Sequence, residues 1–143
     1  MCIRDRIEQR IWAIWGECEG AEAKALMREG VVAMATGQYP AALENFSQLV
    51  EQAPDCAEAW NKRATLYYLM GNFPASVLDI RRTLELEPRH FGALSGLGLI
   101  YDALDDPAAA LRSFEAAVAI NPHLDMTKER IKELRRQLGG RPT

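Results

Sequence analysis

Apolar residues recur at helical spacing along most of the chain. Residues 57–70, AEAWNKRATLYYLM, show this most clearly, because their apolar positions follow the i, i+4, i+7, i+8 pattern of one helix face: Trp60, Ala64, Tyr67 and Tyr68. The Gly71-Asn72 pair predicts the end of this helix. Pro74 predicts the start of the next one, over residues 75–86, because proline is tolerated in the first turn of a helix.

This helix, turn, helix and loop pattern repeats with a period of 34 residues. Pro54, Pro88 and Pro122 are each 34 residues apart, and other residue types keep the same phase. Two columns hold small residues and two hold bulky apolar residues: Gly30, Ala64 and Gly98; Ala42, Ser76 and Ala110; Phe46, Ile80 and Phe114; Leu26, Trp60 and Leu94. Since a fixed period decides the fold of a repeat protein, these columns predict stacked helix pairs in three units, 23–56, 57–90 and 91–124.

Stacked repeats need polar capping helices at their ends. Residues 125–138 suit this role, because Ile131, Leu134 and Leu138 form an apolar stripe and Asp125 or Thr127 can cap the helix start. We expect the charged residues of this segment to face water: Lys128, Glu129, Arg130, Lys132, Glu133, Arg135 and Arg136. Gly139-Gly140 ends the helix, so that residues 139–143 are a tail.

Residues 1–22 are interpreted as an N-terminal cap helix. Ile7, Ile11, Ile14 and Trp15 form its apolar stripe, and Trp12 and Trp15 are core anchors. Half of a truncated repeat is the alternative, but Glu8 would then fall in a column of small residues. The first six residues, MCIRDR, match a translated sequencing adapter. We therefore expect the natural protein to begin upstream, with any targeting segment lost.

Composition narrows the class of protein. A chain of 143 residues with 48% hydrophobic and 26% charged residues has enough apolar material for a folded domain. Its net charge of -3 gives no general attraction to nucleic acid or anionic membranes, and no apolar run approaches the roughly 20 residues of a membrane span. Cys2, Cys18 and Cys56 form no CxxC pair, so we interpret them as unpaired, small apolar residues.

No motif in the sequence indicates catalysis, a metal site or a cofactor. His90 and His123 lie in loops without a cysteine or a second histidine beside them, whereas a metal needs converging ligands. The GALSGLG stretch, residues 92–98, reads as a helix with small packing residues and not as a phosphate-binding loop. We therefore expect a non-enzymatic protein without cofactor or metal.

Residues 23–122 resemble the tetratricopeptide repeat family in several columns at once: tryptophan or leucine, small residue, tyrosine, alanine, aromatic, alanine and proline. The resemblance implies an all-α, right-handed α-solenoid. Ala33, Leu49 and Thr83 depart from the family pattern, and the Asp105-Asp106-Pro107 turn lacks the usual glycine and aromatic residue.

In the resembling family the first helix of each unit lines a concave groove that receives an extended peptide or a helix. The residues in groove-facing positions are Lys24, Met27, Val31, Met34, Glu58, Asn61, Lys62, Thr65, Tyr68, Ser95, Leu99 and Asp102. Met27 and Met34 are either an adaptable contact surface or packing residues under the N-terminal helix. Asn61 can bond a peptide backbone, because an amide is both donor and acceptor.

Arg63 points off this groove. The resemblance implies a pair with Asp79 within the repeat, which we expect to be partly exposed and to contribute about 0 to 1 kcal/mol. Some family members hold a peptide's C-terminal carboxylate with several cationic and amide side chains. Met27, Val31, Gly92 and Gly96 occupy positions where such a clamp needs polar groups, so this mode is not expected here.

The sequence thus predicts a bacterial module that binds a protein partner. A self-associating structural protein is one alternative, and the repeat portion of a longer enzyme or regulatory protein is another. The compartment stays open: cytoplasmic as written, or periplasmic if an upstream signal peptide has been lost.

Overall fold

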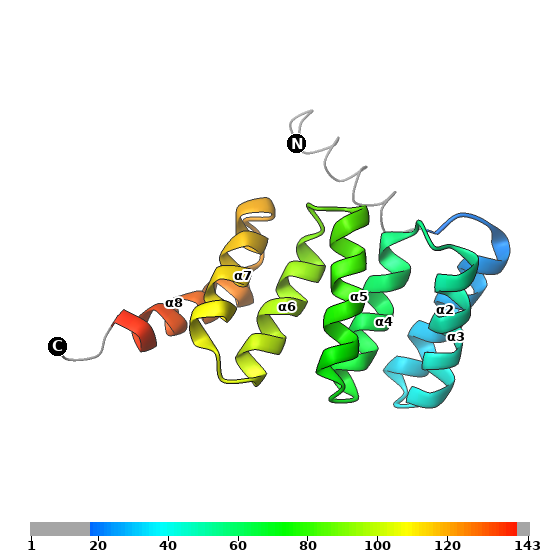
Figure 1. Cartoon of the computed structure of the whole chain (residues 1–143), viewed down its shortest axis with the longest axis horizontal. Coiled ribbons are helices and arrows are strands. Elements are labelled where there is room, and N and C mark those ends of the chain that lie inside the picture. Colours follow the sequence, from blue (N-terminus) through cyan, green and yellow to red (C-terminus); the bar gives the residue numbers. More distant parts are fainter. Residues whose placement is uncertain (1–17, 140–143) are drawn as a thin grey trace. The chain divides into compact units, whose positions relative to one another are not determined.

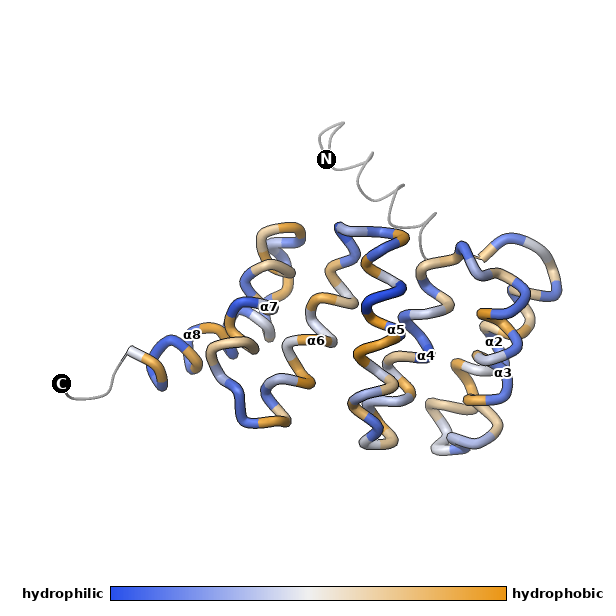
Figure 2. The backbone as a smooth tube through the Cα atoms, in the orientation of Figure 1, coloured by the Kyte–Doolittle hydropathy of each residue, from blue (hydrophilic) through white to orange (hydrophobic). Residues whose placement is uncertain are grey.

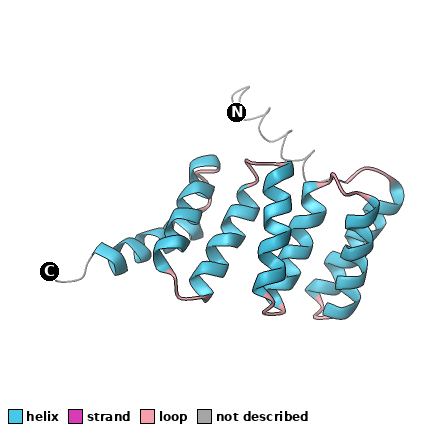
Figure 3. Ribbon diagram, viewed as in Figure 1, coloured by secondary structure: helices cyan, strands magenta, loops and turns pink. Residues whose placement is uncertain are grey.

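The computed structural model describes residues 18–139, and every regular element in that range is an α-helix (Figure 1; Figure 3). The helices are α2 (Ala21–Ala35), α3 (Tyr39–Gln52), α4 (Ala57–Leu69), α5 (Phe73–Leu86), α6 (Phe91–Ala103), α7 (Pro107–Ile120) and α8 (Asp125–Gly139). The all-α prediction is therefore confirmed. The predicted N-terminal cap helix, with Trp12 and Trp15, lies outside the described residues.

Two compact units divide the chain at Leu86, and the first contains α2–α5. Here α2 pairs with α3, α4 pairs with α5, and α3 packs against α4. Phe46, Leu49 and Leu66 are fully buried at the centre of this unit. A Cβ on Gly30 would overlap the Phe46 ring, so the small column and the bulky column are in direct contact.

The second unit contains α6–α8 and has its own core. Helix α6 pairs with α7, and α8 packs against α7. Phe114 is buried with Ile131 and Leu134 of α8. A Cβ on Gly98 would lie 2.5 Å from Cδ1 of Phe114. The contact between Gly30 and Phe46 thus recurs two periods later.

Three turns with the same geometry join the paired helices. Gly37, Gly71 and Asp105 stand 34 residues apart and have φ of 76°, 77° and 59°. In each turn the following residue donates its backbone N–H five residues back, at 2.8 Å (Gln38 to Ala33), 2.8 Å (Asn72 to Tyr67) and 2.9 Å (Asp106 to Tyr101). This bond satisfies a carbonyl that the end of the helix leaves open. The third turn therefore forms although it lacks the glycine.

The cysteine prediction is wrong for two of the three residues. Cys18 and Cys56 form a disulfide, with Cα atoms 5.5 Å apart. Because α2 and α3 are antiparallel neighbours, the segment before α2 returns to the segment after α3, and these two residues meet there. Sequence spacing alone does not show such a meeting. Cys2 lies outside the described residues.

Helix α8 differs from its prediction at three places. Its first backbone bond runs from Lys128 N–H to the Leu124 carbonyl at 2.9 Å, so Asp125 and Thr127 lie inside the first turn and not at the N-cap. Leu138 is 40% exposed, because the buried stripe ends at Leu134. Arg130 does not simply face water but pairs with Asp102 of α6.

Val32 on α2 and Leu66 on α4 hold equivalent positions in two successive repeats but differ in exposure. Leu66 of α4 is 0% exposed, because it packs in the core with residues of α3. Val32 stands one period earlier, on α2, and is 62% exposed. Among residues 18–139, no helix precedes α2 to cover this position as α3 covers Leu66.

Within residues 18–139, no helix combines the length and the apolar character that crossing a membrane requires. Figure 2 shows hydrophobic and hydrophilic segments alternating along the helices.

Candidate partner-binding face

Nine of the predicted contact residues lie on α2 and α4, two helices of the first unit that contact each other. We call these nine residues the α2–α4 face: Lys24, Met27, Val31, Met34, Glu58, Asn61, Lys62, Thr65 and Tyr68. Their spacing of three or four residues puts each set on one side of its helix. Ser95, Leu99 and Asp102 lie on α6, in the second unit.

The α2 half of the face is largely apolar. Met27, Val31 and Met34 are half-buried and pack against the core of the first unit, while Lys24 is exposed. Each of these three apolar side chains packs inward and keeps an exposed part. The N-terminal helix that the packing interpretation requires lies outside the described residues, so the role of the methionines as a contact surface stays a prediction. Such flexible, polarizable side chains adapt to partners of varied shape.

The α4 half of the face is polar and nearly charge-balanced. Lys62 pairs with Glu58 one helical turn earlier at 3.5 Å, so its positive charge is partly neutralised. The Thr65 hydroxyl donates to the Asn61 backbone carbonyl at 3.0 Å. The Asn61 side-chain amide makes no hydrogen bond within the described part of the chain and is half-buried. It therefore has unused donor and acceptor capacity on this face.

Tyr68 closes the α4 half with an aromatic ring. The ring is half-buried and lies 5.7 Å from the Phe73 ring, centroid to centroid, at an interplanar angle of 34°. Phe73 begins α5, so the ring contact fixes Tyr68 against the turn between α4 and α5. A ring held in this way offers apolar area and a hydroxyl at little cost in conformational entropy.

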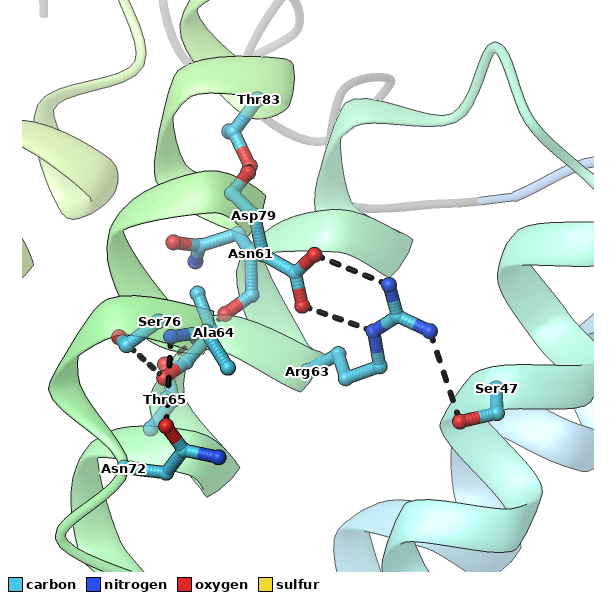
Figure 4. A network of polar contacts seen from close by, with 10 residues as sticks. Ser47, Asn61, Arg63, Ala64, Thr65, Asn72, Ser76, Asp79 and Thr83 are labelled. Carbon is cyan, nitrogen blue, oxygen red and sulfur yellow. Dashed lines mark hydrogen bonds and ion pairs between the residues drawn. The ribbon is translucent and has the colours of Figure 1, made fainter.

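Arg63 lies beside this face and forms the predicted pair with Asp79 (Figure 4). Nε donates to Oδ2 at 2.7 Å and Nη2 to Oδ1 at 2.9 Å, while Nη1 reaches Ser47 Oγ of α3 at 3.5 Å. The side chains of Arg63 and Asp79 are 18% and 6% exposed, so the pair keeps some exposure at Arg63 but buries the Asp79 carboxylate more deeply than the sequence predicts. The guanidinium also lies over the rings of Trp60, at 5.2 Å, and Tyr67, at 5.7 Å.

These contacts keep Arg63 positively charged. The hydrogen bond to Asp79 raises its pKa above the ordinary arginine value, and burial opposes that shift only in part. The pair joins α4 to α5, and the Ser47 contact joins α4 to α3. Arg63 is therefore a packing residue of the first unit.

The three predicted residues of α6 have different surroundings. Leu99 is exposed, and Ser95 Oγ is buried without a hydrogen-bond partner among the described residues. Asp102 receives two bonds from Arg130, Nε to Oδ2 at 2.7 Å and Nη2 to Oδ1 at 2.6 Å. Arg130 also donates to Glu133 at 2.8 Å, and both carboxylates raise its pKa. Asp102 is thus already paired within its own unit.

The two histidines have backbone roles that sequence reasoning missed or left open. His90 is buried and occupies the N-cap of α6, where Nδ1 accepts the backbone N–H of Ala93 at 3.0 Å. The backbone N–H of His123 donates to the Asn121 side chain at 3.1 Å. Between residues 18 and 139 no group of His, Cys, Asp or Glu side chains is placed to hold a metal ion.

A sequence model of the family described as "Tetratricopeptide repeat" matches residues 27–79 and 61–125. The chain belongs to the tetratricopeptide repeat family. A TPR repeat-containing protein of Rhizobium etli is 36% identical over 129 residues, which cover 90% of this chain and 63% of that protein. The matched region thus spans less than two thirds of that relative's length.

Solved tetratricopeptide structures have the same fold. The first TPR of Spaghetti (RPAP3), bound to the HSP90 peptide SRMEEVD, superposes with a TM-score of 0.78 at 18% identity, covering 85% of this chain and 97% of that one. The TPR2B domain of yeast Sti1, in a complex with pHsp70, gives a TM-score of 0.74 at 18% identity, covering 82% and 99%. At this identity the likeness shows the fold alone.

Proposed function

We propose that this tetratricopeptide-repeat chain is a non-catalytic module that binds an extended peptide or a helix of a partner protein on the α2–α4 face. The observation that carries the proposal is the Asn61 amide, which is half-buried and unbonded within the described residues, on the face that also holds the methionines of α2 and the Tyr68 ring. A peptide needs polar groups for its backbone and apolar area for its side chains, and this face presents both.

The composition of the face selects the kind of peptide. Met27 and Val31 stand where capture of a carboxylate would need polar groups, and Lys62 is already paired with Glu58. One exposed cation, Lys24, does not offset the desolvation of a terminal carboxylate. We therefore propose that the partner is an apolar peptide whose backbone is bound by hydrogen bonds. This differs from the acidic peptide SRMEEVD that is bound in the RPAP3 complex.

The proposal is tested by selecting peptides from a displayed random library on the purified chain and measuring their affinity for variants. Tyr68→Ala removes a held aromatic anchor and is expected to weaken binding at least about tenfold. Asn61→Ala removes one backbone contact and is expected to weaken binding about two- to tenfold. Fluorescence anisotropy with a labelled peptide gives both values.

Gln48→Ala is the matched control, because Gln48 is an exposed residue of α3 outside the face. It should leave the affinity unchanged. The peptide SRMEEVD should not compete with the selected peptides. If the selected peptides bind the Asn61 and Tyr68 variants as tightly as the unchanged chain, the α2–α4 face is not the binding surface.

Self-association is a second candidate function, and the exposure of Val32 favours it. In this alternative the outer face of α2 packs against a second copy of the chain. Val32→Glu should then shift the molar mass measured by light scattering toward the monomer. Leu78→Glu is the control, because Leu78 is equally exposed, at 62%, but lies on α5. A concentration-independent monomer removes this candidate.

The repeat portion of a longer enzyme or regulatory protein remains the third alternative. The match covers 63% of the Rhizobium etli relative, so that relative extends beyond the matched region. The full-length reading frame decides between them: a catalytic domain beside these repeats would place the chemistry there and leave binding to the repeats.

A further inference from the structure

The Cys18–Cys56 disulfide joins the starts of the two helices that carry the α2–α4 face. Cys18 lies three residues before α2 begins at Ala21, and Cys56 is the N-cap residue of α4. The bond therefore ties together the first helices of two successive repeats at the same end, across a sequence separation of 38 residues.

This disulfide is part of the core. Cys18 is 2% exposed and belongs to the same buried cluster as Leu26, Leu49 and Val50, and Cys56 packs against that cluster. Reduction requires a thiolate to reach one of the sulfur atoms. Cys18 is shielded in the folded chain and Cys56 is partly buried, so attack on the Cys18 sulfur is hindered and the bond is suited to a structural role.

Direct contact between α2 and α4 is limited, and their noncovalent spacing is set through α3, which packs against both helices. Helix α2 packs mainly against α3 and α4 mainly against α5. The hydrogen bond from Gln52 to Glu22, at 3.1 Å, likewise joins α3 to α2. The disulfide adds a direct covalent constraint on how far the two halves of the face can separate at this end.

We propose that the Cys18–Cys56 disulfide forms in an oxidising compartment and fixes α2 and α4 at the spacing that partner binding requires. This inference rests on the proposed function, because it names the covalent constraint on that same face. A surface whose geometry is fixed in advance loses less entropy on binding, so the oxidised chain binds more tightly than the reduced one. Disulfides persist outside the reducing cytoplasm, which places the working chain there.

The bond forms by thiol–disulfide exchange with a disulfide of a thiol oxidant. The thiolate of one cysteine attacks the oxidant's disulfide and releases one oxidant thiol, which leaves a mixed disulfide. The thiolate of the other cysteine then attacks the chain's sulfur in that mixed disulfide and releases the second oxidant thiol. Two cysteine thiols are oxidised to one disulfide, and the oxidant's disulfide is reduced to two thiols that keep the two protons.

The experiment uses the full chain in a Cys2→Ser background, so that only the two cysteines in question remain. The chain is exported to a bacterial periplasm, denatured without reductant, alkylated and weighed. We expect no alkylated thiol before reduction and two after it. We expect the reduced chain, and the Cys18→Ser/Cys56→Ser variant, to lose about 10 °C of Tm, and their affinity for the selected peptides to fall at least about fivefold.

Each outcome decides one part of the proposal. Two alkylated thiols in the exported chain overturn the disulfide. A disulfide that forms, but whose reduction leaves peptide affinity unchanged, overturns its role on the face. Hydrogen exchange separates these results from failure of the proposed function. If the selected peptides bind elsewhere, faster exchange in the first turns of α2 and α4 after reduction still supports the constraint. Unchanged exchange after reduction overturns it.

Discussion

Arg63 shows at the scale of one residue how a charged side chain becomes part of a packed core. Its guanidinium is planar and presents two parallel N–H donors, which match the two oxygens of Asp79 at 2.7 Å and 2.9 Å. The rings of Trp60 and Tyr67 lie against the same group. Hydrogen bonds and ring contacts together replace the water that the buried charges lose.

Arg63→Leu is expected to destabilise the chain by about 3 to 5 kcal/mol, because it leaves the Asp79 carboxylate buried without its partner. Arg82→Leu is the matched control. Arg82 pairs with Glu85 at 3.1 Å and its guanidinium lies 5.9 Å from the centroid of the Trp60 ring, but its side chain is 38% exposed, so its loss should cost only about 1 to 2 kcal/mol. Urea unfolding of both variants gives the comparison. Loss of partner binding by Arg63→Leu at an unchanged Tm would show instead that Arg63 is a contact residue.

A change of pH near neutrality does not remove the stability that the Arg63–Asp79 pair contributes. Hydrogen bonding to Asp79 raises the pKa of Arg63 above its value in the unfolded chain. A raised pKa adds stability that is fully present below the unfolded pKa and is lost only as pH rises through the folded pKa. Arginine titrates far above neutrality, so the contribution of Arg63 stays constant throughout the neutral range.

Gly30→Ala is expected to destabilise the chain by about 1 to 3 kcal/mol, because its new Cβ would overlap the Phe46 ring in a filled core. Gly139→Ala is the control for the intrinsic effect of replacing glycine in a helix. A Cβ at Gly139 meets nothing within 4 Å, so this change should be neutral or stabilise by up to about 1 kcal/mol. Equal stability of the two variants, measured by thermal unfolding, would contradict the contact.

At the scale of elements, the turn between α6 and α7 shows how a repeat tolerates an unusual residue. Asp105 adopts φ of 59° where the two earlier turns have glycine. Its backbone N–H donates to the Asp102 carbonyl at 3.1 Å, and Asp106 Oδ1 accepts the Ala109 N–H at 3.2 Å, which caps α7. The cap and the turn bonds offset part of the strain of a left-handed residue with a side chain.

Asp105→Gly is expected to stabilise the chain by about 0.5 to 1 kcal/mol, because glycine adopts positive φ without steric cost. Asp105→Val should destabilise it by a larger amount, since a β-branched side chain is an outlier at positive φ. Chemical denaturation of the two variants beside the unchanged chain measures both effects. A destabilised glycine variant would mean that the Asp105 side chain contributes more than its backbone strain costs.

The period explains which parts of these elements are predictable from sequence. Gly30 and Phe46 keep their phase with Gly98 and Phe114, so their contact follows from the columns. The Cys18–Cys56 bond has no partner at the 34-residue spacing, and pairing depends on the antiparallel return of α3 beside α2. One signal was present, because the two cysteines flank the first helix pair at its open end.

Side-chain partners on the candidate face are predictable only in part for the same reason. The Arg63–Asp79 pair lies within one repeat and follows from the family pattern, but its burial comes from packing that no spacing reveals. The bonds of Arg130 to Asp102 join residues 28 apart across the α6–α8 arrangement. His90 caps α6 by accepting the backbone N–H of Ala93, three residues later. The sequence pattern of the loop does not distinguish such a capping histidine from one that faces solvent.

At the scale of the whole molecule, each of the two units buries apolar side chains of its own. The first unit buries Phe46, Leu49 and Leu66 together, and the second buries Phe114 with Leu134. In repeat proteins stability is approximately a sum of terms for each repeat and its neighbours. A change in one core should therefore act mainly on its own unit, unlike a change in a domain with one central core.

Hydrogen exchange with mass spectrometry tests this division. Gly30→Ala should raise exchange most in α2 and α3, whereas Leu134→Ala, which costs about 2 to 5 kcal/mol in a filled core, should raise it most in α7 and α8. Leu138→Ala is the control for α8, because this side chain is 40% exposed and should leave exchange nearly unchanged. Equal acceleration of exchange in α2 and α7 by either core variant would show that the chain opens as one cooperative unit. A partner bound on the α2–α4 face would then stabilise α6–α8 as strongly as it stabilises α2 and α4.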